Sequence, residues 1–317
     1  MCFHTIHNPV QKIKPKGIRF IITALFLALF MLFSGVLQAK SAALLFERAN
    51  FVLIRGGEFT MGSPESEVDR QGDETQHRVR LSDFLMSKYA VTVADFRRFE
   101  AASGYRTDAD NTGFSVIICN CEVNAGKGVN WRYGVSGSLR PQSEENHPVV
   151  HVSWNDAVAY CKWLSKKTGK QFRLPTEAER EYACRAGSTT PFNTGEILAA
   201  DQANYGSNCS DKNNNLTGVY PRNTVAVNSF LPNAWGLYNM HGNVWEWCSD
   251  WYGENYYNSR KAKERAFNPA GPPTGSYRVL RGGSWGNDAD CSRSAYRNCG
   301  IPQRRSYFIG FRLVLVP

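Results

Sequence analysis

The distribution of apolar residues along the chain predicts a short leading segment followed by a region of many strands and few helices. Residues 20–37 form a nearly unbroken apolar run. From residue 51 onward the apolar runs are short and glycines interrupt them, so residues 51–62 predict a strand and a hairpin. Residues 78–85 alternate polar and apolar side chains, as expected of a strand with one buried face.

Three helices are predicted from the residues at their ends. Each begins at a Ser or Thr that is followed three positions later by an acidic residue, which is the pattern of a capping box. Each is followed by a glycine that ends the periodic apolar pattern. The flanking residues are Thr92 and Gly104, Ser153 and Gly169, and Thr176 and Gly187.

The rest of the chain predicts an α+β fold with little regular secondary structure. Beyond residue 188 we expect long loops and short strands. The chain contains 8 Trp, 14 Tyr and 27 Gly, which favours a turn-rich fold with a bulky interior over a helical bundle. No linker divides residues 44–317, so we expect them to form one domain.

The first 43 residues are typical of an export signal. Four basic residues precede the apolar run, and small residues follow it at 39–43, where a signal peptidase could cut. An uncleaved membrane anchor is the alternative, because the run is long for a signal. In both cases the basic start predicts that the main domain is periplasmic or secreted, and that it meets a membrane only through this segment.

The charge of the mature chain argues against nucleic-acid binding. Removing residues 1–39 takes away four of the 37 lysines and arginines and none of the 28 acidic residues, which leaves a net charge of +5. Phosphate recognition needs a concentrated basic face, and no such run occurs. We therefore expect a protein or small-molecule substrate.

Cysteine usage predicts disulfides. Eight of the nine cysteines remain after the signal is removed, and an even count in an exported protein favours disulfide bonds. Their connectivity does not follow from spacing. The Cys119-x-Cys121 pair lies in a loop-like stretch, where metal binding is the alternative.

Five motifs occur in an order that resembles the formylglycine-generating-enzyme superfamily. They are Gly-Gly-Glu-Phe-Thr-Met-Gly at 56–62, the stretch 147–187 with His-Val-Ser-Trp-Asn-Asp-Ala and Arg-Leu-Pro-Thr-Glu-Ala-Glu, Gly-Leu-Tyr-Asn-Met-His-Gly-Asn-Val-Trp-Glu-Trp at 236–247, Arg-Gly-Gly-Ser at 281–284, and Gly-Phe-Arg-Leu at 310–313. The resemblance covers about residues 50–315. It implies an α+β, C-type-lectin-like domain.

The resemblance also implies a catalytic region, which this chain alters. The family's enzyme oxidises a sulfatase cysteine with O₂ and a copper ion held by two cysteines after the Gly-Gly-Ser motif. Here the first cysteine position is matched by Asn287, and only Cys291 could stand in for the second. Cu(I) prefers two thiolates, so the sequence argues against a copper site. Ser284 and Arg297 match family pocket positions, and together with Cys291 they are the candidate catalytic residues.

A structural calcium site is a further implication. The family's ligands match Asn239, Gly242, Val244 and Glu246, which would offer an amide oxygen, two backbone carbonyls and a carboxylate. The alternative is that Glu246 pairs with a nearby arginine. A second family site matches Asn204 and Tyr205 at one end, but no acidic residue stands at its other end, near residues 216–221.

The family fold also suggests disulfide partners. We expect Cys248 and Cys291 to pair, because both follow motifs that the family fold brings near its pocket. Cys161 and Cys184 match family disulfide positions, but their usual partners match Leu313 and Ser294 here. Each would then stay free or pair elsewhere. Cys299 is the candidate partner.

Two functions from different classes remain. The first is an exported oxidoreductase-like protein of this superfamily that acts in oxidative maturation of a protein or metabolite. Relatives without the cysteine pair include a periplasmic protein needed for maturation of a siderophore chromophore, so loss of the copper ligands does not exclude chemistry. The second is a non-catalytic, C-type-lectin-like binding protein whose ligand contacts the segment 298–309.

Overall fold

The computed structural model describes residues 51–119, 122–206, 222–259 and 266–317. The chain separates into two compact units, Met1–Glu47 and Arg48–Pro317, and the second contains every element described below. The predicted export signal and the residues Cys121 and Cys209 lie outside the described residues. No helix of the described part of the chain is long and apolar enough to cross a membrane.

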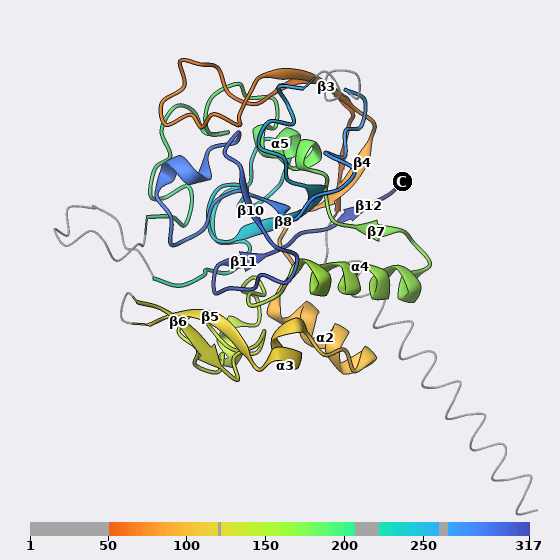
Figure 1. Ribbon diagram of the computed structural model, residues 1–317, viewed down its shortest axis with the longest axis vertical. Coiled ribbons are helices and arrows are strands. Elements are labelled where there is room, and N and C mark those ends of the chain that lie inside the picture. Colours follow the sequence, from red (N-terminus) through yellow and green to blue (C-terminus); the bar gives the residue numbers. More distant parts are fainter. Residues whose placement is uncertain (1–50, 120–121, 207–221, 260–265) are drawn as a thin grey trace, which may run out of the picture. The chain divides into compact units, whose positions relative to one another are not determined.

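Two four-stranded sheets and two hairpins form the strand framework (Figure 1). One sheet has the order β1-β4-β12-β7, and all its pairs are antiparallel. The other has the order β10-β9-β8-β11, in which β11 runs parallel to β8. The strands of the first sheet are β1 (Phe51–Ile54), β4 (Phe84–Ser87), β12 (Val314–Leu315) and β7 (Phe172–Arg173), and those of the second are β10 (Asn298–Gly300), β9 (Arg278–Arg281), β8 (Trp245–Trp251) and β11 (Ile309–Gly310).

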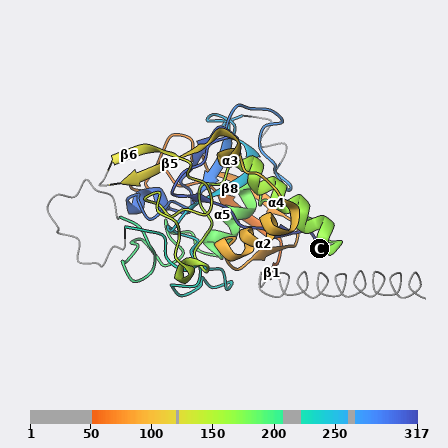
Figure 2. The same cartoon turned by 90° about the horizontal axis from the view of Figure 1, so that it is seen from below.

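The hairpins and helices surround these sheets. The helices α2 and α4 contact each other, and both views show them side by side (Figures 1 and 2). Helix α5 packs on β8 and β9. The hairpins are β2 (Gly57–Met61) with β3 (His77–Leu81) and β5 (Phe114–Cys119) with β6 (Glu122–Lys127), and the helices are α2 (Val93–Ser103), α3 (Asp108–Thr112), α4 (Trp154–Thr168), α5 (Glu177–Arg185) and the 3₁₀ turns η1 (Gln142–Glu144) and η2 (Ala289–Ser292).

The three predicted helices are confirmed, with one change at an end. Helices α2, α4 and α5 each have a complete capping box at the predicted Thr or Ser. Helix α5 ends at Arg185 and is capped by Ala186 in the left-handed conformation, one residue before Gly187, which the sequence had indicated as the end. Helix α3, a single turn that also has a capping box, at Thr107, was not predicted.

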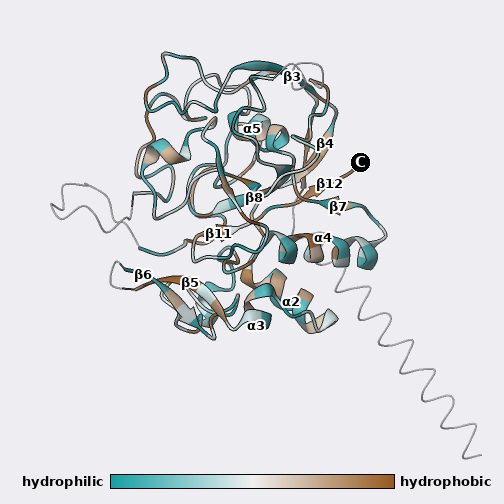
Figure 3. Cartoon of the chain, viewed as in Figure 1, coloured by the Kyte–Doolittle hydropathy of each residue, from teal (hydrophilic) through white to brown (hydrophobic). Residues whose placement is uncertain are grey.

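Apolar faces of these elements meet in a core rich in aromatic residues, and Figure 3 shows α2 and α4 with both apolar and polar faces. One buried cluster includes Ile54, Phe84, Met86 and Leu237 together with Ala178, Ala183 and Cys184 of α5. Four tryptophans are almost completely buried: Trp131, Trp245, Trp247 and Trp285. The α+β class with few regular elements, predicted from composition, is the fold observed.

The expected cysteine pairs are not formed in the structure. The pairing of Cys248 with Cys291 is wrong for this structure, because both are free thiols, one buried in β8 and one half-buried on η2. Cys161, Cys184 and Cys299 are also free. Cys184 instead lies 3.7 Å from the Ser294 hydroxyl, the residue that stands where the family has a cysteine partner. Cys119 is exposed at the end of β5, so that residue belongs to a strand rather than a loop.

A buried aspartate on β8 caps the start of α5. The carboxylate of Asp250 is 2% exposed and accepts hydrogen bonds from the Glu177 backbone N–H and the Ser249 hydroxyl, both at 3.0 Å. Burial, helped by the negative charge of Glu177, raises the pKa of Asp250 from its ordinary value of 3.8 to about 7. The folded protein therefore holds a proton on Asp250 in a pH range where the unfolded chain has lost it.

This shift predicts a pH-dependent loss of stability. Because the folded pKa lies above the unfolded one, the contribution of Asp250 is complete below about pH 4 and is lost as the pH rises through 7. Relative to Asp250→Asn, the wild type should lose up to about 1.4 kcal/mol of unfolding free energy per pH unit in this window. Urea unfolding between pH 4.5 and 7.5 measures the difference, with Asp201→Asn on an exposed loop as control. Equal slopes for wild type and Asp250→Asn would contradict the assignment.

Candidate functional site

Two glycine-containing turns form the frame of the candidate site. The Gly242 N–H donates to the Gly282 carbonyl at 2.7 Å, which joins the His-Gly-Asn loop to the Gly-Gly-Ser turn. Gly242 has φ +74°, and a Cβ there would lie 2.3 Å from the Asn204 carbonyl oxygen. Gly283 has φ +73°, and a Cβ would lie 2.2 Å from the Ser292 hydroxyl. Both motifs need glycine because neighbouring chain segments pack directly on them.

Asn287, which the resemblance aligns with the first copper ligand, is held by two neighbours. Its Oδ1 accepts a hydrogen bond from the Trp245 indole at 2.8 Å and one from the Ser284 hydroxyl at 2.6 Å. Trp245 is 1% exposed and Ser284 is completely buried. Two of the predicted site positions, 284 and 287, are thus bonded to each other, and the Ser284 hydroxyl already has an acceptor.

Cys291 is the one cysteine of the segment 284–297. It is half-buried on η2. Burial is the main cause that raises the pKa of its thiol to about 11, with the neighbouring Asp290 adding to the effect. The thiol is therefore protonated near neutral pH, which lowers both its nucleophilicity and its ability to bind a soft metal.

Arg297, the third candidate catalytic residue, belongs to a buried ion pair. It is 6% exposed, and its guanidinium donates to both carboxylate oxygens of Glu177, at 2.7 and 3.1 Å. The guanidinium also lies 4.8 Å from the ring centre of Tyr252 and 4.6 Å from that of Tyr257. These contacts fix Arg297 between two aromatic rings and a carboxylate.

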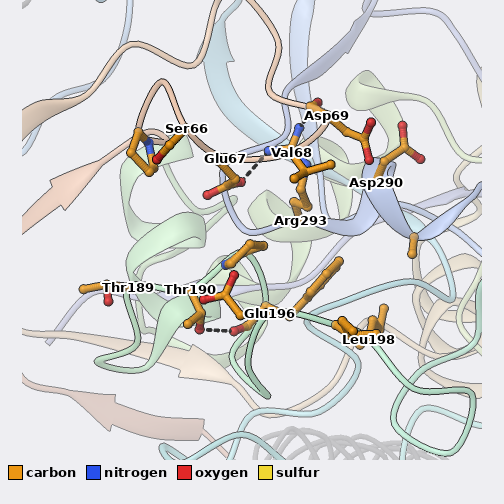
Figure 4. A pocket seen from close by; sticks show the side chains of 15 residues that line it. Ser66, Glu67, Val68, Asp69, Thr189, Thr190, Glu196, Leu198, Asp290 and Arg293 are labelled. Carbon is orange, nitrogen blue, oxygen red and sulfur yellow. Dashed lines mark hydrogen bonds and ion pairs between the residues drawn. The ribbon is translucent and has the colours of Figure 1, made fainter.

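A pocket of about 570 Å³ lies beside this region (Figure 4). Residues of three segments line it: 64–69 after β2, 189–198 after α5, and 289–293 on and after η2. The predicted residues Ser284, Cys291 and Arg297 are not among its lining residues, but Ala289, Asp290 and Arg293 are. The structure therefore places the pocket against the turn that carries Cys291. No pattern along the chain marks this pocket, because three distant loops form it.

One arginine organises the pocket wall. Arg293 is 3% exposed and pairs with Glu67 at 2.6 Å and with Glu74 at 2.8 Å, and Figure 4 shows the first of these pairs. Burial opposes ionisation of Glu74, but the hydrogen bonds from Arg293 and Ser63 outweigh it, so its pKa falls below the ordinary value. At Glu67 burial outweighs Arg293 and raises the pKa. The pocket also contains Asp69, Glu196 and Asp290, so its lining is acidic overall.

Three of the residues expected to bind calcium, Asn239, Gly242 and Val244, lie in the loop before β8. The fourth, Glu246, is the second residue of β8 and faces two arginines. Its carboxylate is 1% exposed and accepts hydrogen bonds from Arg180 and Arg312. These guanidiniums keep the pKa of Glu246 low despite its burial. At the start of this loop the Asn239 Oδ1 is buried without a hydrogen-bond partner, so this oxygen is suited to binding a cation. The Glu246 carboxylate is not, because arginines already occupy it. The arrangement at Glu246 is the arginine pairing that the sequence analysis kept as its alternative.

Copper does not fit the residues present. Two thiolates would be needed, and the segment 284–297 supplies one protonated thiol and an amide that is already hydrogen-bonded. Across the described residues, no group of three or more His, Cys, Asp or Glu side chains is placed to hold a metal ion. Copper chemistry at this site therefore receives no support from the geometry.

Comparison with known proteins agrees with the motifs. A family profile described as "Sulfatase-modifying factor enzyme 1-like domain" matches residues 38–316. The chain is 38% identical to the formylglycine-generating enzyme of Mus musculus, over 82% of this chain and 73% of that protein. It is 36% identical to the enzyme of the same name from Thermomonospora curvata, over 84% of this chain and 93% of that protein.

Among solved structures, PvdO from Pseudomonas aeruginosa is similar to this protein. It is 34% identical and superposes with a TM-score of 0.66, over 84% of this chain and 94% of PvdO. The profile, the sequence identities and the shared fold together show that the chain belongs to the formylglycine-generating-enzyme (sulfatase-modifying factor) family.

Proposed function

We propose that this protein is an exported member of its family that acts in the oxidative maturation of a protein or metabolite without a copper-binding cysteine pair. The observation that carries the proposal is the pocket of about 570 Å³ walled by residues 289–293, next to the Gly-Gly-Ser turn. Family membership supports chemistry in this region, because the relatives at 36–38% identity are named formylglycine-generating enzymes.

The lining of the pocket indicates what kind of group it would receive. Phe192 and Leu198, which are 5% and 3% exposed, supply apolar surface, and Glu196 and Asp290 supply carboxylates. Arg293, the basic residue of the lining, is already paired with two glutamates. The pocket therefore favours a substrate with an apolar part and without negative charge.

A non-catalytic binding protein is the second candidate, and a specific observation favours it. The Ser284 hydroxyl and the Arg297 guanidinium are both buried and engaged with protein partners. A protein that only binds a ligand would keep such groups as structural supports. Its ligand would then contact the segment 298–309, where Ile301 is 48% exposed.

The absence of a copper pair predicts that the protein fails to make formylglycine. A peptide with the sequence Cys-x-Pro-x-Arg should remain unchanged after incubation with the protein, O₂, copper and reductant, as measured by mass spectrometry. Asn287→Cys alone should not restore conversion, because the Cys291 thiol is still held protonated by burial. Conversion by the wild type that disappears in Cys291→Ser would overturn the proposal.

The contacts of Asn287 predict that this residue supports the fold. Asn287→Ala would leave the buried Trp245 indole N–H and the Ser284 hydroxyl without their acceptor, at a cost of about 1–3 kcal/mol of unfolding free energy. Urea unfolding measures the loss, with Asn124→Ala in the exposed β5–β6 hairpin as the matched control. If both variants were equally stable, Asn287 would be available for a functional role instead.

Export can be tested separately. A fusion of residues 1–45 to a reporter enzyme should carry the reporter across the inner membrane, because four basic residues precede the apolar run. Sequencing the N-terminus of the exported product distinguishes cleavage at 39–43 from a retained anchor. A control fusion in which Leu27 and Leu29 are replaced by arginine should stay in the cytoplasm. Retention of the unaltered fusion there would count against export.

A further inference from the structure

We infer that Arg180, rather than a divalent cation, is the positive partner that closes the loop Asn239–Glu246 at its Glu246 end. This inference is independent of the proposed function. It concerns a position where the family resemblance implies a calcium ligand and where the geometry shows a guanidinium. Its consequence is that Glu246 contributes to stability through arginine and not through a metal ion.

The three charged groups are in direct contact and shielded from solvent. The Glu246 Oε2 accepts hydrogen bonds from the Arg180 Nε and the Arg312 Nε, both at 2.6 Å. The Glu246 Oε1 accepts one from the Arg312 Nη2 at 2.8 Å. The side chains of Arg180 and Glu246 are 1% exposed, and that of Arg312 is completely buried. Bonds between ionised groups in such an environment are short and strong.

These hydrogen bonds occupy most of the lone pairs with which the Glu246 carboxylate could bind a metal ion. A carboxylate oxygen has two lone pairs, and both lone pairs of Oε2 are used by guanidinium donors. Calcium would have to bind through Oε1 alone, beside two fixed positive charges. Repulsion by these charges in a buried environment strongly disfavours a dication there.

The guanidiniums also take backbone oxygens of the same part of the chain. The Arg180 Nη2 donates to the Met240 carbonyl at 3.0 Å, and the Arg312 Nη2 donates to the Tyr238 carbonyl at 2.9 Å. A Cβ at Gly282 would lie 2.7 Å from the Arg180 Nη2, so the Gly-Gly-Ser turn leaves the space that this guanidinium occupies. Arg180 therefore satisfies a backbone oxygen of this part of the chain in addition to the Glu246 carboxylate.

The position of Arg180 is set by α5. The capping box at Thr176 fixes the first turn of the helix, and the Arg180 N–H donates to the Thr176 carbonyl at 3.0 Å. Arg312, which lies between β11 and β12, also donates to the Ser87 carbonyl at 3.2 Å. Glu246 thus links α5, through Arg180, to the C-terminal segment, through Arg312. Arg180 also contacts the segment Asn239–Glu246 at the Met240 carbonyl.

A double-mutant cycle tests the pairing. Unfolding constants of the full chain are measured for the wild type, Arg180→Met, Glu246→Gln and the double variant. We expect the coupling between the two positions to exceed tenfold, because removing one partner leaves the other charge buried. The exposed pair Arg78–Glu58, with a nitrogen–oxygen distance of 2.8 Å, is the control and should couple by less than about fivefold. Coupling at Arg180–Glu246 no larger than in the control would overturn the inference.

A calcium titration separates the arginine role from a metal role. The melting temperatures of the wild type and Glu246→Gln are compared in calcium and in chelator. Any shift on chelation should be the same in both proteins, because a cation at the unpartnered Asn239 Oδ1 would not use Glu246. A shift in the wild type that is absent from Glu246→Gln would overturn the inference. If Arg180→Met fails to fold, Arg180→Lys replaces it in the cycle. Arg180→Lys should fold with reduced stability. A stability equal to that of the wild type would count against the bridging role of Arg180.

Discussion

The fold depends on a set of arginine–carboxylate contacts buried around helix α5. All five charged residues of this helix are at most 6% exposed: Glu177, Glu179, Arg180, Glu181 and Arg185. Burying a charge without a partner costs several kcal/mol, so each needs an ion-pair or hydrogen-bond partner. Glu181 and Arg185 pair with each other, and groups from other parts of the chain complete the set. Helix α5 is therefore the point where the N-terminal hairpin, the sheet of β8 and β9 and the C-terminal segment are joined.

This requirement explains why charged residues of the motifs in this chain are buried in ion pairs and are not exposed at a reactive site. Glu181 accepts from the Gly62 N–H at 2.8 Å and pairs with Arg185 and Arg281, which links the first motif to the Gly-Gly-Ser turn. Arg297, which matches a family pocket position, is used for the same purpose on Glu177. The ion-pair network thus includes Arg297, a side chain that the family resemblance assigned to the catalytic site.

The pocket lies where this network reaches the surface. Arg293 connects the loop of residues 64–69 to the turn that carries Cys291, through Glu67 and Glu74. Ion pairs thus hold the part of the wall formed by Glu67 and Arg293, while Val68 of the same segment 64–69 and Ile197 of the segment 189–198 are 77% and 81% exposed. A pocket wall held by ion pairs, beside exposed apolar side chains, is an arrangement suited to binding a substrate.

The sequence by itself determined the local structure and the family. Capping boxes at Thr92, Ser153 and Thr176 act within four residues, so the pattern of neighbouring residues was enough to locate the helices. The end of α5 was misplaced by one residue, because Ala186 takes a conformation that glycine usually takes.

Only the tertiary structure decided how the charged residues are used. Glu246 and Arg180 are separated by 66 residues and Arg297 and Glu177 by 120, and nothing in their spacing indicates that they meet. The same holds for the expected disulfide between Cys248 and Cys291, since proximity of two motifs to one region does not bring two sulfur atoms together. A carboxylate binds a cation or an arginine according to what the fold places beside it, and this is a property of long-range packing that sequence order does not contain.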